Sequence, residues 1–296
     1  MNQPLAIYRP QDLSSNEPPD LASKGYRFLA EGDSWFTIGS LNPAKNSNLL
    51  FELAFTQSAA AVNCGYPGDT LRRMSAMSAD PQFASLLVGK LARFWDGILL
   101  SAGGNDLIDA LQVTNPAVPL AQRLLRHAPE WGPVADGAAR YVSDAGWQTF
   151  AGYVRANLQH LLATRDRGPS AGMPVFMHCY AVPTPRPSGA GLGQGPWLLP
   201  SLQACAIPPA DHGALAAELI GRLRSLLQAC AADAAGFPAL HVFDSTAVAI
   251  DPAAPGATGE SGDWVNEIHL GWRGYEKIAT PAEVDLEQVI AQVRGG

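Results

Sequence analysis

The sequence has little charge, few cysteines and no long apolar run, and each shortage excludes a class of protein. Charged residues make up 16% of the chain, and its lysines and arginines are scattered, with no basic stripe between aromatic side chains. A nucleic-acid partner is therefore not expected. Its apolar stretches are shorter than the roughly 18 residues of a membrane-spanning helix. The stretch from Leu215 to Leu227, for example, is interrupted by Glu218, Arg222 and Arg224. We therefore expect no membrane span.

The sequence also gives little support for a metal site or for a set of disulfide bonds. The four cysteines form no Cys-x-x-Cys pair, and the histidines show no metal-ligand spacing with each other or with cysteine. Buried free thiols in a reducing compartment are the expectation. Residues Met1 to Ser23 contain no basic stretch followed by an apolar one, so they do not resemble a signal peptide. This absence of a leader favours a cytoplasmic location, whereas the oligomeric state has no signal in the sequence.

Apolar residues, in contrast, make up 47% of the chain, which is enough for a large buried core. Five apolar runs end in polar or turn-forming residues and are typical of strands buried on both faces of a parallel sheet. The predicted strands are Tyr26–Glu31, Ser58–Cys64, Gly97–Ala102, Met173–Tyr180 and Leu240–Phe243. Residues 1–22 are polar and proline-rich, so we expect a flexible segment there and a single domain over residues 23–296.

Helical patterns lie between these strands and indicate an α/β sandwich. Asn42-Pro43 is typical of a helix start, and Asp211 is a candidate cap for a helix that Gly236 would end. Thr280-Pro281-Ala282-Glu283 has the form of a capping box that starts the last helix.

Two stretches near 113–141 and 183–209 break this alternation and are read as loop insertions. Both follow strand ends, and ligands of open α/β sheets bind beyond the carboxyl ends of the strands. They are therefore candidate pocket walls or lids, with surface loops that touch no substrate as the alternative.

The first chemical signal is Gly32-Asp33-Ser34, which follows an apolar strand directly. A serine there would sit at the mouth of the sheet, and Gly32 permits a tight turn. By itself the tripeptide is weak evidence, because Asp-Ser is also a common turn and helix-cap pair.

Two further segments carry candidate donors for an oxyanion hole. Gly68, in Gly68-Asp69-Thr70 after the second strand, can aim a free backbone N–H into the crevice. Asn105, in Gly104-Asn105-Asp106 after the third strand, offers a side-chain amide. Each segment alone is equally well explained as an ordinary turn.

Two histidines stand near candidate site positions. His269 lies in a loop close to the C-terminal helix, from which it can reach across the edge of the sheet. His178, at the end of the fourth strand, could line the pocket, although a hydrogen-bonded core histidine is the simpler interpretation.

Ser34, Gly68, Asn105 and His269 occur in this order, and the first three each follow a predicted strand. This pattern, over residues 28 to 278, resembles that of the SGNH/GDSL hydrolase family. The resemblance implies a three-layer α/β/α, flavodoxin-like fold with a parallel five-stranded sheet. It also implies hydrolysis of esters or thioesters through an acyl-enzyme, without a metal or another cofactor. Ser34 would be the nucleophile and His269 the general base, with an oxyanion hole from the N–H groups of Ser34 and Gly68 and the Asn105 amide.

One position departs from the family pattern. The acidic partner of the histidine normally stands three residues before it, and here that residue is Asn266. In serine proteases the same Asp-to-Asn change lowers turnover by about 10⁴, because the imidazole takes the wrong tautomer. Asn266 could orient His269 through its side-chain oxygen, Asp263 or Glu267 could do so instead, or a backbone carbonyl could support a Ser–His dyad.

A carboxylic-ester hydrolase is the leading hypothesis, and its substrate could be a small molecule or a polymer. Trp131, Trp197 and the Leu198-Leu199 pair could form apolar walls for the acyl chain. Two alternatives remain: an acyltransferase on the same scaffold, and a catalytically impaired module that binds a carbohydrate or another ligand.

Overall fold

A six-stranded parallel sheet forms the centre of the computed structural model, which describes residues 2–37, 47–76 and 78–295. The strand order is β2-β5-β3-β6-β7-β8. These strands are β2 (Ala6–Tyr8), β3 (Tyr26–Gly32), β5 (Ala59–Asn63), β6 (Gly97–Ser101), β7 (Val175–His178) and β8 (Leu240–Phe243). Two short strands, β1 (Gln3–Pro4) and β4 (Ala54–Phe55), pair separately and antiparallel.

All five predicted strands are present, but the sheet has a sixth that the sequence did not reveal. Strand β2 lies in the segment 1–22 that was expected to be flexible, and it pairs with β5. Leu5 and Leu21 of that segment are buried in the core. The prediction missed this strand because its three residues are too few to show a periodicity.

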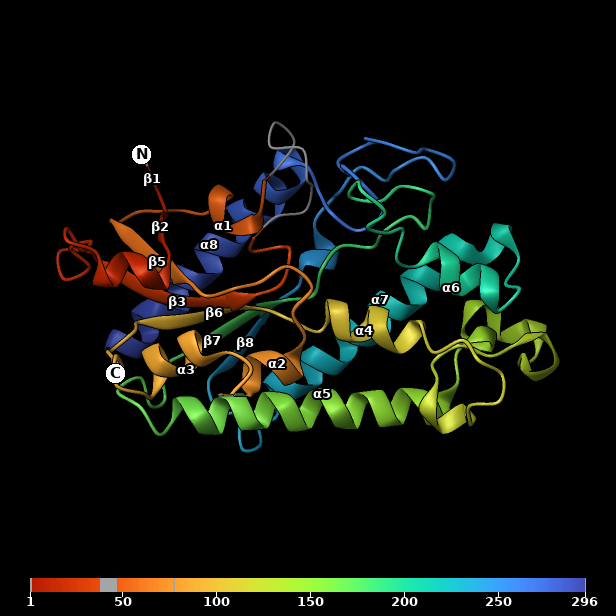
Figure 1. Ribbon diagram of the computed structural model, residues 1–296, viewed down its shortest axis with the longest axis horizontal. Coiled ribbons are helices and arrows are strands. Elements are labelled where there is room, and N and C mark those ends of the chain that lie inside the picture. Colours follow the sequence, from red (N-terminus) through yellow and green to blue (C-terminus); the bar gives the residue numbers. More distant parts are fainter. Residues whose placement is uncertain (1, 38–46, 77, 296) are drawn as a thin grey trace.

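Helices cover both faces of the sheet, so the predicted three-layer α/β/α architecture is confirmed (Figure 1). Helices α1 (Leu49–Glu52) and α8 (Trp272–Gly295) lie on one face. The other face carries α2 (Leu71–Ser75), α3 (Pro81–Leu87), α5 (Asp144–Arg165) and α7 (His212–Ala232). Helices α4 (Gly104–Leu111) and α6 (Leu199–Ala204) lie beyond the carboxyl ends of the strands.

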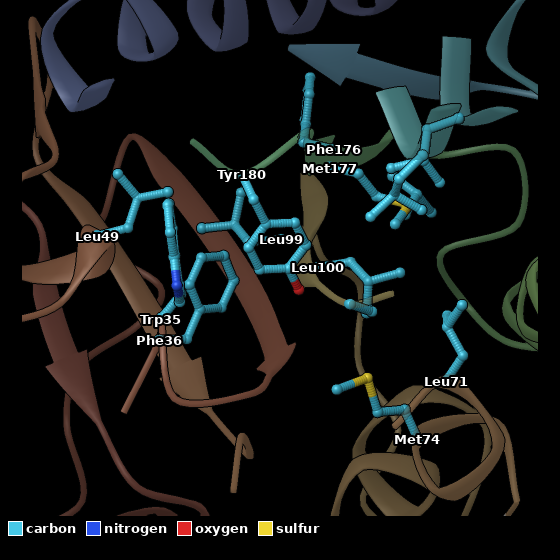
Figure 2. Packing of buried hydrophobic residues seen from close by; sticks show 14 of the residues in the cluster. Trp35, Phe36, Leu49, Leu71, Met74, Leu99, Leu100, Phe176, Met177 and Tyr180 are labelled. Carbon is cyan, nitrogen blue, oxygen red and sulfur yellow. The ribbon is translucent and has the colours of Figure 1, made fainter. Parts of the chain in front are cut away.

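The central strands are apolar on both faces because both faces are packed. Figure 2 shows Trp35, Phe36 and Leu49 on one side of β6, and Leu71 and Met74 of α2 on the other. Each of these five side chains is at most 5% exposed. This packing holds the end of β3, and therefore the turn that carries Ser34, from both sides.

The structure confirms one predicted helix start, while another lies outside the described residues. Asp211 is the N-cap of α7, but its side chain accepts a hydrogen bond from the Tyr141 hydroxyl instead of capping, and the helix ends at Ala232, before Gly236. Residues 42 and 43 lie outside the described part of the chain, and Asn48 caps α1.

The capping box at Thr280 is wrong, because α8 begins at Trp272 and continues through Pro281. Tyr275, Ile278 and Ala279 precede the proline and are fully buried. Their packing outweighs the hydrogen bond that a proline inside a helix removes.

Among the described residues, no helix is long and apolar enough to cross a membrane. All four cysteines are unpaired: Cys179, Cys205 and Cys230 are buried and Cys64 is half-buried.

Candidate active site

Three of the predicted site segments meet because they leave the same edge of the sheet. Strand β3 pairs in parallel with β5 on one side and with β6 on the other, where Gly32 lies opposite Ser101. The turns with Ser34, Gly68 and Asn105 follow these three strands. His269 reaches the same edge from the loop that precedes α8.

Ser34 is positioned by a tight turn after β3. The Asp33 carboxylate accepts a hydrogen bond from Trp35 N at 2.9 Å, and Phe36 N donates to the Asp33 carbonyl at 3.1 Å. Gly32 must be glycine, since a Cβ there would lie 2.8 Å from the Ser101 Cβ and 2.9 Å from the Phe36 ring. Ser34 is 8% exposed, and its Oγ lies 2.7 Å from His269 Nε2.

Asn266 occupies the position of the third triad member. Its Oδ1 lies 2.8 Å from His269 Nδ1 and also accepts hydrogen bonds from the backbone N–H groups of His269, at 2.9 Å, and Ile268, at 3.2 Å. The two backbone donors require an oxygen at this position, and an oxygen requires a proton on Nδ1. His269 Nε2 therefore presents its lone pair to the Ser34 hydroxyl.

The two other candidate partners of His269 are engaged elsewhere. Asp263 Oδ2 binds Lys277 Nζ at 2.6 Å and accepts from Asp251 N at 2.8 Å. The Glu267 carboxylate is fully buried and accepts backbone hydrogen bonds from residues 186, 197, 198 and 199. Of the three acidic or amide side chains considered, the structure places Asn266 alone on the imidazole.

The His269 imidazole is neutral in this environment. Burial lowers its pKa from the ordinary value of 6.5 to about 3, because the charged imidazolium loses its hydration. The ring is 3% exposed, and Trp197 packs edge-on against it with ring centroids 5.3 Å apart. Asn266 brings no negative charge that would raise the pKa again.

Of the candidate oxyanion donors, Asn105 lines the same pocket as Ser34. Gly68 has a φ of +81°, a left-handed conformation that suits glycine. Within the described residues, the backbone N–H groups of Ser34 and Gly68 have no hydrogen-bond acceptor. Asn105 Nδ2 donates to the Asp69 carbonyl at 3.0 Å, which fixes the amide and uses one of its two hydrogens.

A small apolar pocket lies beside Ser34, with a cavity volume of about 50 Å³. Its lining residues come from the nucleophile turn, helix α4, the segment after β7, helix α7 and the histidine loop: Asp33, Ser34, Trp35, Gly104, Asn105, Leu107, Ile108, Tyr180, Ala181, Pro183, Leu198, Ile220 and Ile268.

Only one of the two predicted loop insertions contributes to this pocket. Segment 183–209 provides Pro183 and Leu198, and the Glu267 carboxylate anchors it. Segment 113–141 provides no described lining residue. Trp131, considered above as a wall, instead packs at right angles on Tyr141 with centroids 5.1 Å apart.

A second buried hydrogen-bond network, not anticipated from the sequence, supports the nucleophile turn. Tyr180 N donates to His178 Nδ1 at 3.2 Å, so the His178 proton is on Nε2, which lies 2.9 Å from Ser101 Oγ. Ser101 Oγ and the Tyr180 hydroxyl in turn donate to the Asp33 carboxylate at 2.8 and 2.6 Å. His178 is thus a hydrogen-bonded core histidine, and its stacking on Trp35 places it beneath the turn. The predicted position of His178 at the end of a strand was the one feature of the sequence that could have indicated this network.

Comparison with known proteins gives only distant likenesses. No protein-family model matches the sequence, and no curated protein matches it. An extracellular lipase from Streptomyces rimosus aligns with a TM-score of 0.46 and 16% identity, over 87% of this chain and 99% of the lipase. A carbohydrate acetylesterase family member from Sinorhizobium meliloti aligns at 0.47 and 14%, over 90% and 99%. An aryl esterase from M. smegmatis aligns at 0.44 and 12%, over 89% and 99%. These values describe a similar path of the backbone and carry no information about the reaction.

Proposed function

We propose that this protein is a serine hydrolase of the SGNH/GDSL type, which cleaves carboxylic esters through an acyl intermediate on Ser34. The observation that carries the proposal is the hydrogen-bonded series Ser34 Oγ–His269 Nε2 and His269 Nδ1–Asn266 Oδ1, at 2.7 and 2.8 Å. A serine hydroxyl is a weak nucleophile at neutral pH unless a base takes its proton, and here the lone pair of a neutral imidazole faces it.

The reaction has two matched halves. Ser34 Oγ attacks the ester carbonyl carbon while His269 Nε2 takes the hydroxyl proton. Collapse of the tetrahedral intermediate breaks the bond to the leaving alcohol, which receives that proton from His269. Water then attacks the acyl group in the same way, with His269 as base, and releases the carboxylic acid and the free serine.

The negative charge that develops on the carbonyl oxygen needs hydrogen-bond donors. The N–H groups of Ser34 and Gly68 and the second amide hydrogen of Asn105 are suited to this role. One donor of this kind is worth roughly 3 to 4 kcal/mol of activation free energy. The hydrogen bond from Asn105 to the Asp69 carbonyl supports its assignment, because a donor fixed in advance needs no reorganisation during the reaction.

Asn266 serves as the orienting member of the triad in this mechanism. It supplies the hydrogen bond that selects the tautomer but not the negative charge that would stabilise the imidazolium. The apolar pocket beside Ser34 favours a short acyl group, since its volume of about 50 Å³ holds only a few carbon atoms.

The proposal is tested by labelling the folded protein with a fluorophosphonate probe and locating the modified residue by mass spectrometry. We expect the wild type to be labelled on Ser34 and the Ser34→Ala variant to remain unlabelled and inactive on a panel of p-nitrophenyl esters. Failure to label the folded wild type would leave the ligand-binding alternative. Preferential transfer of the acyl group to an added alcohol instead of water would identify an acyltransferase.

A further inference from the structure

Three carboxylates converge on one point next to the proposed oxyanion turn. Glu31 lies near the end of β3, Asp69 directly follows Gly68, and Asp80 is the N-cap of helix α3. One carboxylate oxygen from each lies within 4.8 Å of the other two. None of the three takes part in the proposed ester hydrolysis.

The burial of this carboxylate cluster, Glu31, Asp69 and Asp80, leaves one oxygen without a hydrogen bond among the described residues. Glu31 is fully buried, and its Oε1 accepts from Gly32 N at 2.9 Å, whereas Oε2 has no hydrogen-bond partner among the described residues. Asp69 is 3% exposed, and its Oδ1 forms an ion pair with Arg73 Nε at 3.0 Å. Buried polar atoms in native proteins almost always have a partner, so the unpartnered Glu31 Oε2 beside two other carboxylates indicates a missing ligand.

The charge around the cluster leads to the same conclusion. Arg73 Nε lies 3.0 Å from Asp69 Oδ1, but its side chain is 58% exposed and offsets only part of three negative charges. A proton shared by Glu31 and Asp80 would involve that pair alone, whereas one cation can bind all three carboxylates.

We propose that Glu31, Asp69 and Asp80 bind a divalent metal ion of the hard, oxygen-preferring class, with Ca²⁺ as the best fit. Calcium bonds carboxylate oxygens at about 2.3–2.6 Å, so two of its ligands can stand up to about 5 Å apart. The observed separations meet this limit without movement of the backbone. Magnesium, at about 2.0–2.1 Å, requires a tighter group and usually retains more water.

This metal ion would be structural and would not touch the reacting atoms. It would join the strand that leads to Ser34 with the turn that carries Gly68. The Asp69 carbonyl in that turn also holds the Asn105 amide, at 3.0 Å. Binding would therefore fix the oxyanion donors relative to the nucleophile. The binding itself does not depend on the proposed hydrolase activity.

The test uses full-length protein stripped of metal with EDTA and then freed of the chelator. Isothermal titration calorimetry with CaCl₂ should give one site per chain, and saturating Ca²⁺ should raise the Tm by at least about 4 °C. Asp80→Asn should abolish both effects while the protein stays folded, since asparagine is as good an N-cap as aspartate. Glu31→Gln should abolish them too, and the exposed Asp136→Asn should change neither.

The proposal would be overturned if stripped wild type showed no binding heat and no rise in Tm with Ca²⁺, Mg²⁺ or Mn²⁺. It would also be overturned if Asp80→Asn bound Ca²⁺ like the wild type. A higher Tm of metal-free Glu31→Gln, combined with no binding by the wild type, would assign the cluster to a shared proton. An enzyme that binds Ca²⁺ but hydrolyses no ester would contradict the proposed function and leave the metal site standing.

Discussion

Asn266 Oδ1 lies 2.8 Å from His269 Nδ1 and receives two backbone hydrogen bonds at the same time. These contacts hold the imidazole in a single tautomer with a neutral partner. The usual objection to asparagine in a catalytic triad is that it selects the wrong tautomer. That objection does not apply here, because the backbone donors force the amide oxygen, not the nitrogen, towards the ring.

Removing the Asn266 side chain should therefore slow catalysis. We expect Asn266→Ala to lower kcat by about 10²-fold, because His269 loses the group that fixes its tautomer. Asn266→Asp should retain wild-type kcat or exceed it, since a carboxylate accepts the same hydrogen bonds. Steady-state kinetics on p-nitrophenyl acetate, with Asn115→Ala as a surface control, tests this. An unchanged kcat for Asn266→Ala would remove the residue from the mechanism.

The pH dependence should distinguish asparagine from aspartate at this position. Catalysis needs neutral His269, so activity is lost as the pH falls through the pKa of this histidine. Burial lowers this pKa to about 3, and the wild type should therefore keep its kcat/KM well below the ordinary histidine value of 6.5. In Asn266→Asp the carboxylate stabilises the imidazolium and raises the pKa, which moves the acid limb towards neutral pH. A wild-type acid limb close to pH 6.5 would contradict the neutral-triad interpretation.

The amide of Asn105 should matter for turnover more than for binding. Asn105→Ala removes one proposed oxyanion donor, and we expect kcat to fall by about 10² to 10³ with little change in KM. Asn105→Asp should be at least as slow, because it places a negative charge beside the oxyanion. Since Asn105 also bonds the Asp69 carbonyl, thermal melts are needed to show that both variants are folded. A rise in KM at constant kcat would instead indicate a role in substrate binding.

The pocket beside Ser34 should set the preferred acyl length. The wild type should favour acetyl and propionyl esters, and Ile108→Ala or Ile220→Ala should shift the preference to longer chains. Each accommodated CH₂ is worth about 0.8 kcal/mol, or roughly fourfold in kcat/KM. Ile290→Ala is the matched control, because this isoleucine is buried in α8 outside the pocket. Identical chain-length profiles for all four proteins would place the acyl group elsewhere.

The Glu267 carboxylate should act as the anchor of the pocket wall. It accepts backbone hydrogen bonds from residues 186, 197, 198 and 199. In Glu267→Gln an NH₂ group replaces one acceptor oxygen and faces N–H donors, which should cost about 2 to 3 kcal/mol of unfolding free energy. The kcat/KM should fall as well, because Trp197 and Leu198 lose their support. Chemical denaturation and kinetics test this against the exposed Glu276→Gln, which should resemble the wild type.

The architecture was predictable from the sequence because four of the five predicted strands, β3, β5, β6 and β7, are almost wholly buried. Runs such as Gly97–Ala102 are mostly apolar, and polar or turn-forming residues at the end of each run mark the carboxyl end of a strand. Since parallel strands present those ends at one edge, the order Ser34, Gly68, Asn105 sufficed to bring three of the site residues together. Strand β2 was not predicted because it has only three residues. Its strand conformation depends on pairing with β5, which the sequence does not show.

The features that could not be predicted depend on contacts between distant segments. The sequence favoured Asn266 but left Asp263 and Glu267 open as partners for His269, because all lie close to it in sequence. Only the fold shows that Lys277 engages Asp263 and that the wall segment engages Glu267. The carboxylate cluster could not be predicted from the sequence for the same reason. Glu31 and Asp80 are far apart along the chain, one in a strand and the other at a helix N-cap.

The hydrogen bond between Ser34 and His269 joins residues 235 positions apart, one near the start of the chain and one just before its last helix. The two reacting groups thus have no local means of finding each other. A fragment that ends before the loop with His269 would hold a nucleophile without a base, and a fragment that starts after the turn with Ser34 would hold a base without a nucleophile. Ester turnover should consequently report on completion of the whole fold. During urea titration it should vanish no later than the tryptophan fluorescence of the native core, and it should return on refolding only when both ends of the polypeptide have docked.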